Sequence, residues 1–178
     1  MITVLSGTDR KDSMTKIVSN YVHQKVKTLE DQVQLLSLEE LPEEIFDNKN
    51  YDPKNHSEAM NNMQDQYLIN ADKLILIAPE YNGSFPGSLK HFIDIFSVRN
   101  YAPTFKGKKV ALIGVSSGRA GNLRGMDHLS AILMHVGVII YPNQLPISSV
   151  KDAIEDNKLT AKDSQQSIDA ILEGFVKF

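Results

Sequence analysis

Short apolar blocks alternate along the chain with longer segments in which apolar residues recur every three or four positions. An unbroken apolar block is typical of a buried strand, and the second pattern predicts an amphipathic helix. Five strands are predicted, at residues Ile2–Ser6, 33–38, 73–79, 108–116 and 136–142. Helices are predicted around residues 13–29, 60–67, 86–97, 126–136 and 168–175, and an irregular, proline-containing stretch covers 42–57.

The alternation of strands and helices defines the fold class. Strands joined by helices run parallel, and both faces of such a sheet are covered by helices. Right-handed crossovers and five strands favour an α/β fold, a flavodoxin-like three-layer doubly wound sandwich with a five-stranded parallel sheet in the order 2-1-3-4-5. No repeat or composition shift divides the chain, so residues 1–178 are predicted to form a single domain. In this fold the ligand crevice lies at the carboxyl ends of strands 1 and 3.

The composition restricts the ligands that the protein could take. The 19 basic and 22 acidic side chains give a net charge of −3, which argues against a nucleic-acid partner. The apolar runs are shorter than the roughly 20 residues of a membrane span, so no membrane association is expected. The chain has no cysteine, which excludes thiolate catalysis and favours a cytoplasmic location, and its histidines do not stand at metal-ligand spacing. A small-molecule partner is therefore expected.

The loop after the first strand, "SGTDRKDSMT", combines hydroxyls, an arginine and the start of a helix. Gly7 lets the chain turn, Thr8, Ser13 and Thr15 offer hydroxyls, and Arg10 offers a planar fork of donors. The helix that starts near Ser13 adds free N–H groups and the positive end of its dipole. Together these groups suit a phosphate. The alternative is an ordinary capped helix beside a surface arginine.

Two further polar loops follow the third and fourth strands. "PEYNGSFPGSLKHFID" contains the tight-turn pair Asn82 and Gly83, and Tyr81 could pack against a flat heteroaromatic ring. "SSGRAGNLRG" contains glycines that permit close approach and serines that can donate to ring carbonyls. Each could be an ordinary connecting loop, but all three meet at one sheet edge, and this convergence favours a binding crevice.

The loops resemble those of the NADPH-dependent FMN reductase family, which includes chromate, quinone and azo-dye reductases. The family's first loop, roughly G-S-x-R-x-x-S-x-N, is matched by Gly7, Thr8, Arg10, Ser13 and Thr15. Its second, P-E-Y-N-x-S-x-P-G-x-L-K-N-x-I-D, is matched over residues 79–94. The resemblance implies that the first loop binds the FMN phosphate, the second lies along the isoalloxazine ring and the third closes over its other edge. The implied FMN-binding residues are Thr8, Arg10, Ser13, Met14, Thr15, Pro79, Glu80, Tyr81, Asn82, Gly83, Ser84, Ser116, Ser117, Gly118 and Arg119.

The resemblance also implies an activity. The protein is expected to be an FMN-dependent NAD(P)H oxidoreductase that uses NADPH or NADH as co-substrate and passes hydride through FMN to a quinone, an azo compound, a metal ion or free flavin. Ser116, Ser117 and the amide of Gly118 are implied donors to the N1–C2=O edge of the ring, and no side chain is expected to act as a catalytic acid or base. Asp9 is a departure from the pattern that suits a phosphate only if its side chain points away.

Two other functions compete with the reductase. A flavodoxin-type electron carrier has the same fold, but carriers usually have a T-x-T-G-x-T phosphate loop and a strongly acidic surface, which this chain lacks. A receiver-type regulatory module would need paired acidic residues after the first strand, where Gly7 and Thr8 stand instead. The reductase is therefore the preferred interpretation, with the carrier as the alternative.

One helix suggests assembly. Leu89, Phe92, Ile93 and Phe96 form an apolar stripe on the helix at 86–97, and Phe85 and Tyr101 stand near its ends. This is more apolar surface than one side of the sheet needs, which predicts that some of it is exposed on a monomer. Because related reductases are commonly dimers or tetramers, the protein is expected to form a homodimer or homotetramer. The alternative is that the whole stripe belongs to the core of one chain.

Overall fold

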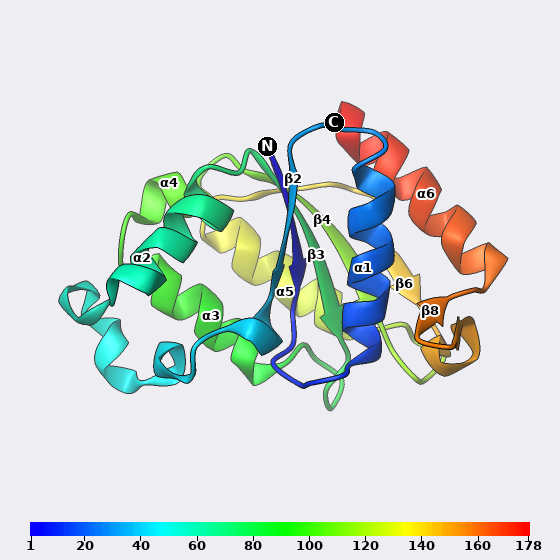
Figure 1. Ribbon diagram of the computed structural model, residues 1–178, viewed down its shortest axis with the longest axis horizontal. Helices are drawn as coiled ribbons and strands as arrows, with labels where there is room; N and C mark the ends of the chain where they lie inside the picture. The colour runs from blue at the N-terminus through cyan, green and yellow to red at the C-terminus, as the bar shows by residue number, and fades with distance from the viewer.

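The computed structural model describes residues 1–178 and places a twisted parallel sheet between two layers of helices (Figure 1). The strands of the main sheet are β1 (Ile2–Ser6), β2 (Val33–Ser37), β3 (Lys73–Pro79), β4 (Lys109–Val115), β5 (Ile139–Ile140) and β6 (Leu145–Ile147). Their order is β2-β1-β3-β4-β5, with β6 also paired to β4, and every pair is parallel. The predicted fold class and strand order are confirmed.

Successive apolar side chains along each strand point to opposite faces of the sheet, so both faces are apolar. Helices therefore cover both faces. The main helices are α1 (Met14–Val26), α2 (Glu58–Met63), α3 (Gly87–Ser97), α4 (Tyr101–Phe105), α5 (Leu123–His135) and α6 (Lys162–Lys177). Helices α1 and α6 pack on one face in a core that includes Ile75 and Ile77, whereas α2 to α5 pack on the other with Leu74 and Leu76. None of these helices has the length and apolar character needed to cross a bilayer.

Shorter elements fill the long connections. The irregular stretch predicted at 42–57 consists of 3₁₀ turns, and a π-helical segment follows α2. The 3₁₀ turns in this region are η1 (Leu38–Glu40), η2 (Glu43–Phe46), η3 (Asn48–Tyr51) and η4 (Pro53–Asn55), and the π-helical segment is η5 (Gln64–Ile69). These turns lie over the outer side of α3, away from α1 and α6 (Figure 1).

The fifth strand is shorter than predicted and is interrupted. The predicted strand at 136–142 is reduced to β5, and the chain returns to β4 only at β6, which pairs with residues 113–115. Pro142 lies between the two pieces and has no N–H to donate, which is tolerated at a sheet edge but breaks the ladder. The interruption places the carboxyl end of β6, not of β5, at the ligand edge of the sheet.

The polar segment that follows β6 contains regular secondary structure. It contains a 3₁₀ turn, η6 (Val150–Ala153), and a small antiparallel hairpin of β7 (Ile154–Glu155) and β8 (Lys158–Leu159). Val150 and Leu159 are buried in the core beneath α1 and α6. This hairpin therefore fixes residues 148–151 close to the carboxyl end of the sheet.

The four stripe residues of α3 are buried, whereas Phe85 and Tyr101 near the helix ends are only partly buried. Leu89, Phe92, Ile93 and Phe96 are between 0% and 4% exposed within the single chain. They pack against the sheet face and against the other helices of the same layer, and Phe92 and Phe96 contact each other edge to face with centroids 4.8 Å apart. The four stripe residues are therefore core, and Phe85 and Tyr101 are the members of the predicted apolar set that stay partly exposed.

Candidate functional site

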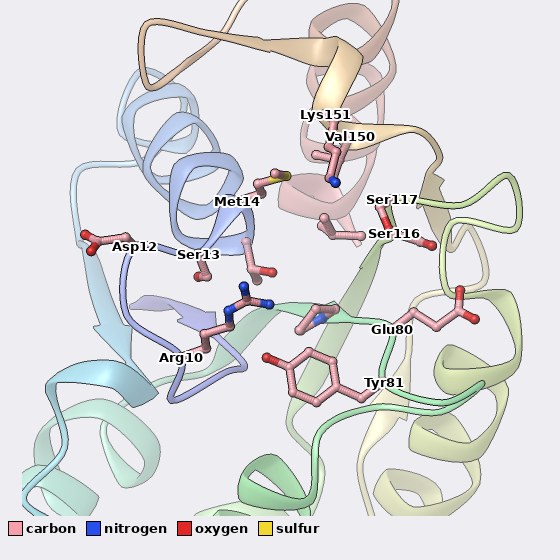
Figure 2. A pocket seen from close by; sticks show the side chains of 13 residues that line it. Arg10, Asp12, Ser13, Met14, Glu80, Tyr81, Ser116, Ser117, Val150 and Lys151 are labelled. Atoms are coloured by element: carbon pink, nitrogen blue, oxygen red, sulfur yellow. The ribbon is translucent and has the colours of Figure 1, made fainter.

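Two cavities lie side by side at the carboxyl edge of the sheet and share Glu80, Ser116 and Ser117 among their lining residues. The first has a volume of about 270 Å³ and is shown in Figure 2. Its lining residues are Arg10, Asp12, Ser13, Met14, Thr15, Pro79, Glu80, Tyr81, Val115, Ser116, Ser117, Val150 and Lys151. The second has a volume of about 550 Å³, and its lining residues are Glu80, Asn82, Gly83, Ser116, Ser117, Gly118, Arg119 and Ala120. The three predicted loops therefore meet in one crevice.

The amino end of α1 opens into the first cavity. The Ser13 hydroxyl caps the helix by accepting from the Lys16 N–H at 3.1 Å, which typically stabilises a helix by about 1 kcal/mol. The backbone N–H groups of Met14 and Thr15 have no acceptor within the protein. A capped helix and an anion site were alternatives in the sequence, and the geometry is compatible with both, because a hydroxyl that accepts can still donate its own proton.

Arg10 extends its guanidinium into this cavity from below the helix end (Figure 2). Thr8 is fully buried and does not line either cavity, unlike the prediction that it offers its hydroxyl to a ligand. Its Oγ1 instead accepts from the Arg10 N–H at 3.3 Å and shares a 3.0 Å hydrogen bond with the Tyr81 hydroxyl. Thr8 therefore joins the first loop to the second and holds both Arg10 and Tyr81 in place.

The acidic side chains of the first loop turn away from the cavity. Asp9 accepts a 2.8 Å hydrogen bond from the Ser88 hydroxyl in the first turn of α3. Asp12 stands at the rim with its carboxylate directed outward (Figure 2). Asp9 therefore points away from the cavity, as a phosphate site requires. Neither carboxylate would face an anion bound there.

The second loop is a two-residue hairpin turn. Tyr81 and Ser84 exchange backbone hydrogen bonds of 2.8 and 3.0 Å, and Asn82 and Gly83 between them have φ values of +52° and +76°. Positive φ at both positions is the type I′ pattern that an Asn-Gly pair adopts readily. The Ser84 hydroxyl bonds to His128 Nδ1 at 3.0 Å and lines neither cavity, so its predicted role as a ligand contact has no geometric support.

A buried asparagine fastens this second loop to α5. The Nδ2 atom of Asn122 donates to the carbonyl oxygens of Ala78 and Pro79 at 2.9 and 3.0 Å. Asn122 is fully buried and has a φ of +66°, which asparagine tolerates better than most residues. It thereby links the start of α5 to the end of β3, directly before Glu80. The loop pattern in the sequence gave no sign of this role.

The third loop is held by the segment that follows β6. Gly118 donates its N–H to the Ser116 Oγ at 2.9 Å, so this amide, predicted as a free donor, is engaged within the loop. The Ser116 N–H donates to the Ile147 oxygen, and the Val150 N–H donates to the Ser116 oxygen, both at 3.0 Å. Backbone hydrogen bonds to Ile147 and Val150 therefore hold one side of the third loop.

Sequence patterns missed five lining residues: Asp12, Val115, Ala120, Val150 and Lys151. Three of them, Asp12, Val115 and Ala120, stand directly beside predicted residues in the sequence. Val150 and Lys151 are more instructive because they come from η6, far along the chain. The rule that ligands bind at strand carboxyl ends applies to β6 as well, and applied to "PISSVK" it could have found them.

These features first define a class of protein. A doubly wound sheet whose crevice joins a cationic helix end to a polar, glycine-containing cleft suits a nucleotide with a phosphate at one end and a flat ring at the other. The sequence profile described as NADPH-dependent FMN reductase matches residues 1–152, and the chain belongs to this family of FMN-dependent NADPH oxidoreductases.

Individual relatives agree with the family. An NADPH azoreductase from Bacillus sp. (strain OY1-2) is 28% identical over 160 residues, 89% of this chain and 81% of that protein. An FMN-dependent NADPH-azoreductase from Staphylococcus aureus is 31% identical over 144 residues, 80% of this chain and 73% of its own length. The solved structure of FerB, a flavoenzyme NAD(P)H:(acceptor) oxidoreductase from Paracoccus denitrificans, superposes with a TM-score of 0.77 at 26% identity, covering 99% of this chain and 94% of FerB.

Proposed function

We propose that the crevice binds FMN with its phosphate in the first cavity and its isoalloxazine ring in the second. The observation that carries the proposal is the pairing of an inward-pointing Arg10 with the unaccepted N–H groups at the start of α1. The oxygens of a phosphate monoester accept hydrogen bonds from such donors, and the positive end of the helix dipole also attracts the phosphate. The adjoining cavity, walled by the second and third loops, offers room for a flat ring.

The protein's own residues supply position and electrostatics. When bound, FMN accepts a hydride from NAD(P)H and passes the electrons to a second substrate. Pro79 and Tyr81 line the first cavity, where it adjoins the ring cavity. Ser116 and Ser117 line both cavities, and their hydroxyls can donate to a ring edge that becomes negative on reduction. No side chain is assigned as a catalytic acid or base.

For the electron acceptor we propose a flat conjugated molecule, a quinone or an azo compound. The ring cavity is bordered by Gly83 and Gly118, which have no side chain, and by Ala120, which has only a methyl group. Such a border can admit a second planar molecule beside a bound ring. Two of the relatives named above are azoreductases. Of the acceptors that the sequence suggested, metal ions and free flavin are ranked below these.

The experiment is a spectrum of the purified protein followed by anaerobic mixing with NADPH and with NADH. Bound FMN gives visible flavin absorbance, and NAD(P)H should bleach it within the time of a stopped-flow measurement. Reoxidation by a quinone or an azo dye then completes the cycle. A protein that binds FMN tightly but is not bleached by either nucleotide would be a flavodoxin-type carrier, and the reductase proposal would be wrong.

Two finer expectations accompany this proposal, a cytoplasmic location and assembly into a homodimer or homotetramer. For assembly, the support is the groove between α3 and α5, about 510 Å³ and lined in part by Ile93, Tyr101 and Ile132. Met134, 56% exposed, lies on the same helix as Ile132. Sedimentation equilibrium at micromolar concentration tests it, since a species of 19.9 kDa alone would contradict self-association.

A further inference from the structure

Lys151 is a cation at the flavin cavity that the family pattern does not contain among its matched loops. It lies on η6, and its side chain extends from above toward the first cavity, across from Arg10 (Figure 2). Its ammonium group has no carboxylate within ion-pair distance and no hydrogen-bond partner in the protein. An unpaired lysine that lines a cavity is free to bind an anion there.

The backbone beneath Lys151 is fixed to the third loop. Ser149, with a φ of +47°, donates its N–H to the Gly118 oxygen at 2.9 Å, and the Ser148 hydroxyl donates to the Arg119 oxygen at 2.6 Å. The neighbouring Val150 is only 2% exposed and packs into the core. Because the three residues before it are held in this way, the backbone of Lys151 has a defined position at the cavity wall.

The single positive charge of Arg10 is smaller than the negative charge of a phosphate monoester. Such a group carries roughly −1.5 to −2 charges near pH 7. Arg10 supplies one positive charge, and the amino end of α1 acts as roughly half a charge. The carboxylates of Asp9 and Asp12 are negative, but both point away from the cavity. Arg10 and the helix end together supply roughly 1.5 positive charges, so up to about half a charge of a dianion is left unmatched. Lys151 is the lysine that lines this cavity.

We propose that Lys151 is a second cationic contact of the FMN phosphate and grips it from the side opposite Arg10. This inference rests on the proposed FMN site and adds a residue to it. Binding from two sides explains why η6 is tied to the third loop: the tie places the lysine at the phosphate end while the loop borders the ring. An ammonium is suited to this role because it makes a point contact and needs no planar fork.

The test compares Lys151→Met with Lys158→Met, a matched control on the β7–β8 hairpin that follows η6, whose exposed side chain lines neither cavity. Dissociation constants of the flavin-free proteins for FMN and for riboflavin are measured by flavin fluorescence quenching. Loss of a charge-assisted hydrogen bond should weaken FMN binding by about 10- to 100-fold in Lys151→Met and leave riboflavin binding unchanged. Lys158→Met should match the wild type, and Lys151→Arg should retain most of the FMN affinity.

Salt gives an independent readout. The FMN affinity of the wild type should fall more steeply with ionic strength than that of Lys151→Met, because one charge pair fewer is screened. An equal loss of FMN and riboflavin binding would place Lys151 at the ring or ribityl chain and overturn the proposal, and an unchanged FMN affinity would also overturn it. A wild-type protein that fails to bind FMN would instead refute the proposed function itself.

Discussion

Replacing Asn122 should destabilise the fold by an amount that its two hydrogen bonds and its backbone conformation together predict. The side chain is buried and its Nδ2 donates to the carbonyl oxygens of Ala78 and Pro79 at the end of β3. Removing the amide takes a donor from each carbonyl in a place that water does not reach. The φ of +66° adds a second, separable contribution, because alanine is strained in this conformation and glycine is not.

The magnitudes follow from these two contributions. A net loss of about 1 kcal/mol for each hydrogen bond predicts that Asn122→Gly lowers the free energy of unfolding by about 2 kcal/mol. Asn122→Ala adds about 1 kcal/mol of left-handed strain and should cost about 3 kcal/mol. Asn122→Asp keeps the shape of the side chain but faces two carbonyl oxygens with a carboxylate, so it should be the most damaging of the three.

Urea unfolding of the flavin-free proteins, followed by circular dichroism, gives the three free energies. The order Gly, Ala, Asp of increasing cost is the expected result. An Asn122→Asp protein that unfolds at the same urea concentration as the wild type would show that the amide does not donate to these carbonyls, and the reasoning would be refuted. Equal costs for the glycine and alanine variants would refute the strain contribution alone.

Three other changes have defined outcomes. Arg10→Ala should weaken FMN binding by about 10- to 100-fold with riboflavin binding unchanged, and equal losses in a titration would exclude a phosphate contact. A hydrogen bond from Arg99 holds the pKa of Asp65 below its usual 3.8. Because the Asp65 side chain is 46% exposed, the pair adds at most about 1 kcal/mol to the free energy of unfolding above pH 4, and this is lost as the pH falls through the lowered pKa. Asp65→Asn should therefore make acid unfolding less steep. Gly114→Ala would place a Cβ atom 2.2 Å from the Gly121 oxygen and should cost about 1–3 kcal/mol in a thermal unfolding measurement.

Gly7 illustrates how a correct residue can be chosen for an incomplete reason. The sequence suggested that this glycine lets the chain turn after β1. In the structure its N–H donates to the Ile77 oxygen at 2.8 Å, and a Cβ atom would stand 2.9 Å from that same oxygen. The requirement is close approach of two neighbouring strands, which a local pattern does not contain.

The sequence by itself determined the fold class, the strand order and the edge of the sheet where the loops meet. These follow from local periodicity, since uninterrupted apolar strands joined by helices leave one economical arrangement, and parallel strands bring their carboxyl ends to a single edge. The Asn82-Gly83 turn was also determined locally, because both residues tolerate the positive φ values that the hairpin requires.

Tertiary structure alone decided which side chains face the crevice and which support it. Thr8 and Tyr81 meet across 73 positions of sequence, Asn122 reaches back to the end of β3, and Lys151 arrives from η6. The apolar stripe of α3 could equally have been surface or core until its neighbours in the helical layer were placed. Periodicity records which face of an element is apolar, but the partner that covers this face depends on contacts between segments far apart in the chain.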